Sequence, residues 1–218
     1  DLTQSNNNTV SNNAINTSGS YGYGIEIYRS INNTITNNNI NTSGSRGYGI
    51  YVEYSNNSKL PNNTITTSGN NGYGMYIYSS DGNNITGGSI ISILSYEYKL
   101  QNSGTTNNFT NTNFTTSRKI SFQDSTSWFN YRNDSSSNIW LKTNVSAQAN
   151  ITRKLINWNQ SLMKWNDTNN TAGITARYNL TGLVANKYYY VYNNSVSTYN
   201  LTTDASGNLP SFTIYLGS

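Results

Sequence analysis

Two carboxylates are the residues of this sequence whose type and spacing could support catalysis. Glu26 and Glu53 occur in similar contexts, Ile-Glu-Ile and Val-Glu-Tyr. If neighbouring strands carry them on one face, their backbones lie roughly 8 Å apart, within the range of about 6.5–9.5 Å that separates the two carboxylates of inverting glycosidases. The chain has no His and no Cys. This excludes an imidazole base, a thiol nucleophile and metal ligation through those side chains, and no cofactor is expected.

The element that carries these carboxylates is an internal repeat. Asn-Thr-Ser-Gly at 16–19 returns at 41–44, and returns as Thr-Thr-Ser-Gly at 66–69, an interval of 25 residues. A fixed period of roughly 20–50 residues indicates one supersecondary unit stacked on copies of itself. Asn, Ser, Thr and Gly dominate the unit, while strong helix formers are scarce. Each unit therefore predicts one coil of a parallel β-helix, with three short strands and three turns.

Apolar residues recur at four positions of the repeat and form four columns. These columns are Val10, Ile35, Leu60 and Ile85; Ile15, Ile40, Ile65 and Ile90; Ile25, Ile50 and Met75; and Ile27, Val52 and Ile77. Each column is expected inside the coils, stacked at the strand spacing of about 4.8 Å. A polar column of Asn13, Asn38 and Asn63 is expected to form a ladder of side-chain amides. The pattern extends to about residue 122.

The repeats resemble a known family. The runs Asn-Thr-Ile-Thr-Asn-Asn-Asn-Ile at 33–40 and Gly-Tyr-Gly-Ile-Tyr-Val at 47–52 are similar to the right-handed parallel β-helix repeats of pectate-lyase-like and NosD-like surface and periplasmic proteins. The resemblance covers residues 1 to about 122 and implies a short right-handed parallel β-helix. It implies no particular activity, because such repeats occur both in enzymes and in inert stalks.

The outward positions of the central strands form a grid three coils high and two residues wide. The grid comprises Glu26, Tyr28, Tyr51, Glu53, Tyr76 and Tyr78. Enzymes of the resembled fold place several Asp or a calcium site there, with basic partners on adjacent coils. Tyr at these positions favours a non-enzyme. The tyrosines are either β-formers covering the strands or a contact face for a protein or a sugar. A protein is favoured over a sugar because no long insertion forms a groove.

The second half of the chain has a different pattern. After residue 122 the period is lost, and all four Trp occur there. Seven strand-like runs follow, at 138–145, 150–158, 161–165, 173–179, 187–192, 198–203 and 211–216. They predict an immunoglobulin-like or fibronectin III-like β-sandwich. Leu183 and Tyr189 resemble a tyrosine corner, although Ala185 replaces the usual Pro, and the Tyr189 hydroxyl is expected to bond nearby backbone. The predicted all-β chain thus has domains at 1–122 and 123–218.

Charge and hydropathy exclude two classes of partner. Lys and Arg number 13 against 9 Asp and Glu, a net charge of +4 with no basic cluster. Nucleic-acid binding needs such a cluster, so it is not expected. No run of 18 apolar residues is present, so no membrane span is predicted in this chain.

Glycosylation sequons, Asn-x-Ser/Thr, indicate a location outside the cell. The candidate N-glycosylation sites are Asn7, Asn16, Asn32, Asn41, Asn56, Asn62, Asn84, Asn108, Asn113, Asn133, Asn144, Asn150, Asn159, Asn166, Asn169, Asn179, Asn193 and Asn200. A chain rich in Asn, Ser and Thr produces sequons by chance, but these exceed that expectation modestly. They favour an extracellular, cell-surface protein with N-linked glycans.

The sequence as a whole predicts an extracellular structural protein. It would be a subunit of a filament, sheath or stalk, self-associating head-to-tail into a homopolymer. The first coil, with Val10, Ile15 and Ile25, would receive the sandwich of the next molecule, because no cap precedes it. The first alternative is an adhesin or carbohydrate-binding module with a glycan ligand. A polysaccharide-degrading enzyme that uses Glu26 and Glu53 is more remote.

Overall fold

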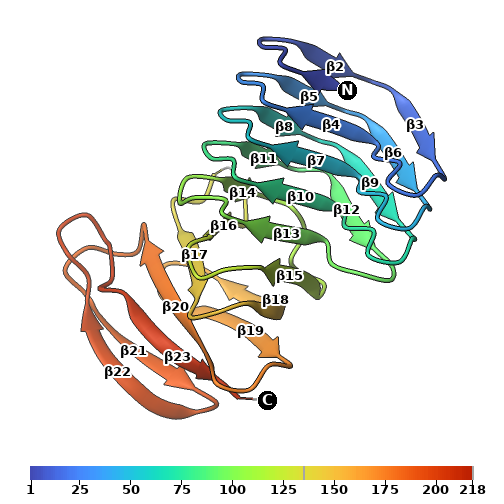
Figure 1. Ribbon diagram of the computed structural model, residues 1–218. Coiled ribbons are helices and arrows are strands. Elements are labelled where there is room, and N and C mark those ends of the chain that lie inside the picture. Colours follow the sequence, from blue (N-terminus) through green and yellow to red (C-terminus); the bar gives the residue numbers. More distant parts are fainter. Residues whose placement is uncertain (135, 218) are drawn as a thin grey trace.

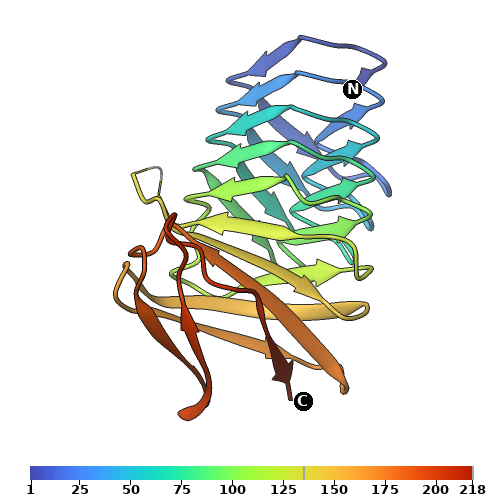
Figure 2. The same cartoon turned by 90° about the vertical axis from the view of Figure 1, so that its left-hand side faces the viewer.

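Stacked β-strands build the whole of the described chain. A computed structural model describes residues 1–134 and 136–217, and every regular element in these residues is a strand (Figure 1). The first half winds into a β-solenoid of about five turns (Figure 2). This confirms the all-β prediction and the stacked coils. The described residues contain no helix long and apolar enough to cross a membrane.

Three sheets run along the solenoid. The first sheet contains β1 (Leu2–Thr3), β4 (Ile25–Tyr28), β7 (Ile50–Glu53), β10 (Met75–Tyr78), β13 (Tyr98–Gln101), β15 (Arg118–Phe122), β18 (Ala149–Trp158) and β19 (Met163–Asn169). The second contains β2 (Thr9–Ser11), β5 (Thr34–Thr36), β8 (Lys59–Pro61), β11 (Asn84–Thr86), β14 (Asn108–Thr110), β16 (Phe129–Arg132), β17 (Trp140–Val145), β20 (Ile174–Thr181) and β23 (Phe212–Leu216). The third contains β3 (Ala14–Thr17), β6 (Asn39–Thr42), β9 (Thr64–Thr67) and β12 (Ser89–Ser92).

The strand register confirms the predicted apolar columns. Ile50 pairs in parallel with Ile25 on one side and with Met75 on the other. Ile40 pairs in the same way with Ile15 and Ile65. Side chains alternate between the two faces of a strand, so every second residue enters the interior. The columns therefore form one continuous apolar core.

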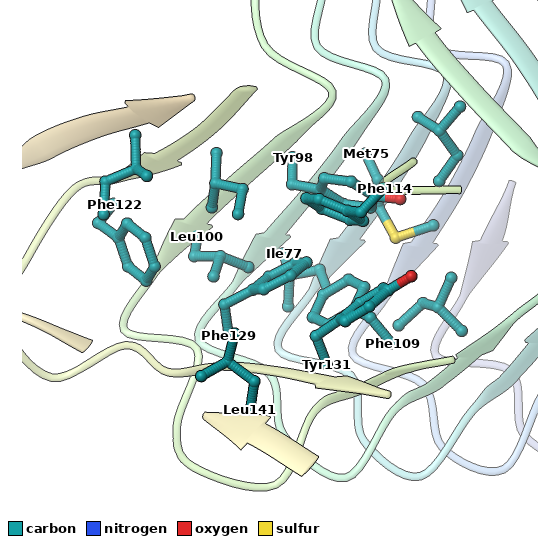
Figure 3. Packing of buried hydrophobic residues seen from close by; sticks show 14 of the residues in the cluster. Met75, Ile77, Tyr98, Leu100, Phe109, Phe114, Phe122, Phe129, Tyr131 and Leu141 are labelled. Carbon is teal, nitrogen blue, oxygen red and sulfur yellow. The ribbon is translucent and has the colours of Figure 1, made fainter. Parts of the chain in front are cut away.

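Aromatic rings replace aliphatic side chains toward the end of the solenoid. Figure 3 shows Tyr98, Phe109, Phe114, Phe129 and Tyr131 packed against one another. The ring centroids of Phe109 and Phe129 lie 4.2 Å apart, and those of Tyr98 and Phe109 lie 5.1 Å apart. Coils without the 25-residue period thus still fill the same interior.

Polar ladders satisfy the buried corners of the coils. The Asn38 side-chain amide donates to the Val10 carbonyl at 3.0 Å and to Asn63 Oδ1 at 3.0 Å. Asn13 donates its backbone N–H to Asn38 Oδ1 at 3.1 Å. A buried polar group without a partner costs free energy, so each coil needs its neighbour to complete these bonds. The predicted amide ladder is confirmed.

A glycine recurs just before each central strand because a side chain at that position would have no room. A Cβ on Gly49 would lie 2.1 Å from Ile65 Cγ2 and 2.5 Å from the Gly74 carbonyl oxygen. The neighbouring coil is backbone at this point and cannot give way. Any side chain here would push two coils apart.

The second half extends the solenoid sheets with antiparallel strands. β18 pairs antiparallel with β15, and β17 pairs antiparallel with β16. In the first sheet, β19 lies next to β18. In the second sheet, β20 lies next to β17, and β23 lies next to β20. β21 (Tyr188–Asn193) and β22 (Val196–Thr202) form a separate two-stranded sheet. The predicted fibronectin III-like sandwich is therefore not confirmed, because most of its strands extend the two solenoid sheets, beginning with β17 and β18 at their edges.

The boundary region and the tyrosine corner can be placed within this arrangement. β16 lies beyond residue 122 and still pairs in parallel with β14, and the division into domains at 1–122 and 123–218 stays a prediction. The Tyr189 hydroxyl accepts the Val184 N–H at 3.1 Å and donates to the Gln160 carbonyl at 2.6 Å. This confirms that Tyr189 bonds nearby backbone.

Candidate functional site: a tyrosine face on the solenoid

The outer side of the first sheet brings the six grid residues together. Glu26 pairs with Tyr51, which pairs with Tyr76 on the next coil. Tyr28 lies beside Glu53 in the same register, and Tyr78 follows. Tyr76 is buried and the other five side chains are half-buried. The strands β4, β7 and β10 hold all six in two rows because their alternate residues fill the core.

A third row of rings, which the sequence pattern did not predict, lies beside these two. The tyrosine of each Gly-Tyr-Gly segment precedes a strand, and its ring lies beside the grid. We call the combined surface the tyrosine face; it comprises Tyr23, Glu26, Tyr28, Tyr48, Tyr51, Glu53, Tyr54, Tyr73, Tyr76, Tyr78 and Tyr96. The 25-residue recurrence of Gly-Tyr-Gly was the signal that could have found this row.

Rings within a row stack on one another along the solenoid. Tyr23 and Tyr48 have centroids 5.0 Å apart and planes 8° apart, and Tyr51 and Tyr76 are 5.0 Å apart at 19°. Rings of different rows meet edge to face, as Tyr48 and Tyr76 do at 87°. Nearly parallel rings at this centroid distance are offset-stacked, so each covers part of its neighbour's face. In the stacked pairs, part of each ring face is therefore covered by the next tyrosine.

A basic side chain lies against the tyrosine rings at each end of the tyrosine face. Lys99 Nζ lies 4.6 Å from the ring centroid of Tyr73 and 4.4 Å from that of Tyr76. Burial, together with the charge of Arg46, lowers the pKa of Lys99. At the other end, Arg29 lies over the Tyr28 ring at 5.0 Å. Such cation–π contacts restrict the rings without consuming their hydroxyl groups.

The two carboxylates lie among these rings. Partial burial raises the pKa of Glu26, and the nearby negative charge of Glu53 raises it further. Among the residues that the structure describes, neither carboxylate forms an ion pair. A groove of about 1140 Å³ lies in the other half of the chain and is not lined by Glu26 or Glu53. The pair lies on the outer side of the first sheet, on strands β4 and β7.

Alkaline pH should test how tightly the tyrosine face is packed. Burial and neighbouring tyrosines raise the pKa of Tyr48 to about 12, and burial also raises the pKa of Tyr51 and Tyr76. The unfolded chain ionises its tyrosines near about pH 10, so it loses these protons first. Stability is then complete below about pH 10 and falls as the pH rises through about 12.

Ultraviolet absorbance of phenolate and circular dichroism, recorded together, measure this. We expect Tyr48, Tyr51 and Tyr76 to ionise together with unfolding, because burial raises the pKa of each. Complete titration of all tyrosines near pH 10, with the fold intact, would contradict the packing described here.

The sequons differ in accessibility. Exposed ones are Asn7, Asn16, Asn32, Asn41, Asn56, Asn62, Asn84, Asn113, Asn159, Asn166 and Asn200. Half-buried ones are Asn108, Asn133, Asn144, Asn150, Asn179 and Asn193. Asn169 is buried, and its side-chain amide donates to the Thr171 carbonyl at 2.5 Å. A glycan can attach only where the Asn amide reaches solvent.

Comparison with known proteins identifies the solenoid. Residues 1–154 match the family model described as "Periplasmic copper-binding protein (NosD)". The match spans the solenoid and reaches into β18. No curated protein and no solved structure matches the chain.

The donor groups of this chain do not fit a copper ion. Protein copper sites use imidazole, thiolate and thioether ligands, and this chain has no His, no Cys and two Met. Met75 is 1% exposed and lies in the core, far along the chain from Met163 on β19. No cluster of three or more His, Cys, Asp or Glu suited to a metal exists among the described residues.

Proposed function

This chain belongs to the NosD family of periplasmic β-helix proteins, and on that premise we propose that it is a structural subunit outside the cytoplasm. It assembles with copies of itself, and the tyrosine face is its lateral protein contact. The family match extends over 154 of 218 residues. The absence of imidazole and thiolate donors separates this chain from copper carriage. The tyrosines that pair with Glu26 and Glu53 on the adjacent strands, in place of further carboxylates, support a non-catalytic role.

The stacking of tyrosine rings is the observation that carries the proposal. A sugar that binds an aromatic platform lies against an exposed ring face. Here Tyr51 and Tyr76 each cover part of the other's ring face, as do Tyr23 and Tyr48. Ring edges and hydroxyl groups, fixed on a rigid sheet, suit a flat protein partner instead. Tyr is enriched at protein interfaces because it supplies apolar area and a hydrogen bond at a low entropic cost.

Edge strands at both ends support head-to-tail growth. In the described chain β1, β2 and β3 each pair with a strand on one side only, and Leu2, Val10 and Ile15 are half-buried there. At the other end, β23 terminates the second sheet. Unpaired edges are templates for pairing with another chain. A heterologous contact between unlike ends propagates into a filament or sheath. The exposed sequons support a glycosylated cell-surface location.

Electron microscopy of the purified protein at high concentration tests this function. We expect laterally associated filaments from the native chain. The double variant Tyr28→Lys/Tyr54→Lys adds charge to the tyrosine face and should leave single filaments. Asn39→Lys/Ile91→Lys is the matched control, because it adds the same two charges at exposed positions of β6 and β12 in the third sheet. A monomer under all conditions would overturn the proposal. Saturable binding on a glycan array, without self-association, would favour the carbohydrate-binding alternative.

A further inference from the structure

A long apolar groove lies in the second half of the chain, away from the tyrosine face. Its volume is about 1140 Å³, and its two sides are β19 and β21. Leu180, Leu209 and Phe212 line it and are themselves buried. Figure 1 shows the β21–β22 hairpin standing apart from β19, with β23 between them in that view. The groove therefore separates two strands that border the same apolar floor.

Both sides of the groove are strand edges. β19 lines it with the consecutive residues 163–166, and β21 does so with the consecutive residues 188–192. Side chains on a strand alternate between faces, so a surface that meets consecutive residues meets the edge of the strand. β20 and β23 contribute one residue each, Leu180 and Phe212. The groove contacts each of these two strands on one face, and the two strands form its floor.

Neither edge has a hydrogen-bonding partner strand within the described chain. β19 pairs only with β18, and β21 pairs only with β22. The Leu155 N–H on β18 points away from β19, because it donates to the Phe114 carbonyl at 2.9 Å. Leu155 is paired with Trp165. By the alternation of an antiparallel ladder, Trp165 and Met163 turn their N–H and C=O groups toward the groove.

The charge of the lining specifies the occupant. Lys164 and Lys187 are the charged residues among those that line the groove, and no Asp or Glu lines it. Val184 and Tyr190 add exposed apolar area. We propose that the groove binds an extended segment of a partner protein as an added β-strand between β19 and β21. Alternate apolar side chains of that segment contact Leu180 and Phe212, and its carboxylates lie near Lys164 and Lys187.

The length of the segment and its source follow from the strands. β19 has seven residues and β21 has six, so the segment spans about six residues, or about 20 Å. A second copy of the folded chain is a poorer fit. Its strands are held in sheets on at least one side, so it could offer an edge but not a strand with both edges free. The proposal stands apart from the self-assembly proposed above.

Synthetic peptides test the proposal on the full chain by titration calorimetry. The probe is Glu-Val-Thr-Val-Thr-Val-Glu, and the control is Glu-Val-Val-Val-Thr-Thr-Glu, which has the same composition without the alternation. We expect the probe to bind and the control to bind at least about tenfold more weakly. Met163→Pro removes one edge N–H at the first residue of β19, where Pro is tolerated. It should weaken probe binding by about tenfold.

Charge reversal provides an independent arm. Lys164→Glu/Lys187→Glu should weaken binding of the probe and favour a Lys-flanked version. Lys154→Glu, at an exposed position of β18 outside the groove, should change neither. Equal binding of both peptides, or insensitivity to Met163→Pro, would overturn the proposal. So would concentration-dependent protection of the Trp165 amide from hydrogen exchange without peptide, because a second copy would then fill the groove.

Discussion

Replacing Ile50 with Asp is expected to unfold the solenoid at room temperature. Ile50 is 0% exposed and lies between Ile25 and Met75 on the adjacent coils. An Asp there would bury a carboxylate without a partner, at a cost of several kcal/mol or a forced protonation. A domain of this size is stable by only about 5–15 kcal/mol. Loss of the cooperative thermal transition, followed by circular dichroism, measures the effect.

Two variants and a pH series make the Ile50 result specific. Ile50→Val removes one methylene and should cost about 0.5–1.5 kcal/mol. Thr64→Asp adds the same charge at an exposed position of β9 and should have little effect. The buried carboxyl would have a raised pKa, so Ile50→Asp should recover stability as the pH falls and the group is protonated. An unchanged melting temperature for Ile50→Asp would contradict the register of the core.

The second large effect is expected from a buried ion pair. Arg153 on β18 donates Nε to Asp167 Oδ1 at 2.8 Å and Nη2 to Asp167 Oδ2 at 2.6 Å. The same Nη2 donates to Thr143 Oγ1 at 2.8 Å, and the Tyr178 hydroxyl donates to Asp167 Oδ2 at 2.7 Å. Burial opposes the charge of Arg153, but the Asp167 carboxylate outweighs it and raises the Arg153 pKa. These bonds join the first sheet to the second.

Asp167→Ala should therefore destabilise the protein by about 3–5 kcal/mol, because Arg153 would remain buried without its counter-charge. The double variant Arg153→Met/Asp167→Leu replaces the pair with apolar side chains and should recover most of that loss. Chemical denaturation of the wild type, Arg153→Met, Asp167→Leu and the double variant gives the coupling free energy. Additive effects of the two single changes would show that the pair does not act as a unit.

The solenoid was predictable because every coil repeats the same pattern. Ile25, Ile50 and Met75 occupy one column, and their common period makes register, facing and interior position readable from spacing alone. The row containing Tyr23 and Tyr48 was not predicted because these residues precede strands β4 and β7 and lie outside their alternating pattern. Spacing gives the position of a turn residue along the chain, but the direction of its side chain depends on the turn geometry.

The second half could not be derived in the same way. Its strands were located correctly in many places, as for β20 and β21, but strand patterns do not specify partners. β18 pairs with β15 because the last coil leaves an exposed edge, and nothing local to residues 149–158 encodes that choice. Arg153 and Asp167 were also missed. A charged residue in a strand pattern reads as solvated, and its burial depends on a partner from another strand.

The amide ladder means that the length of the solenoid can change in steps of one coil. Asn38 completes its bonds with residues one coil above and one coil below, and no bond in this ladder reaches farther. Each coil therefore contacts only its nearest neighbours, as in other one-dimensional arrays. Adding or removing one 25-residue coil changes the length by about 4.8 Å and leaves every remaining contact type intact. The distance between the two ends of the stack can thus be changed in steps by gene duplication, with the antiparallel end unaltered.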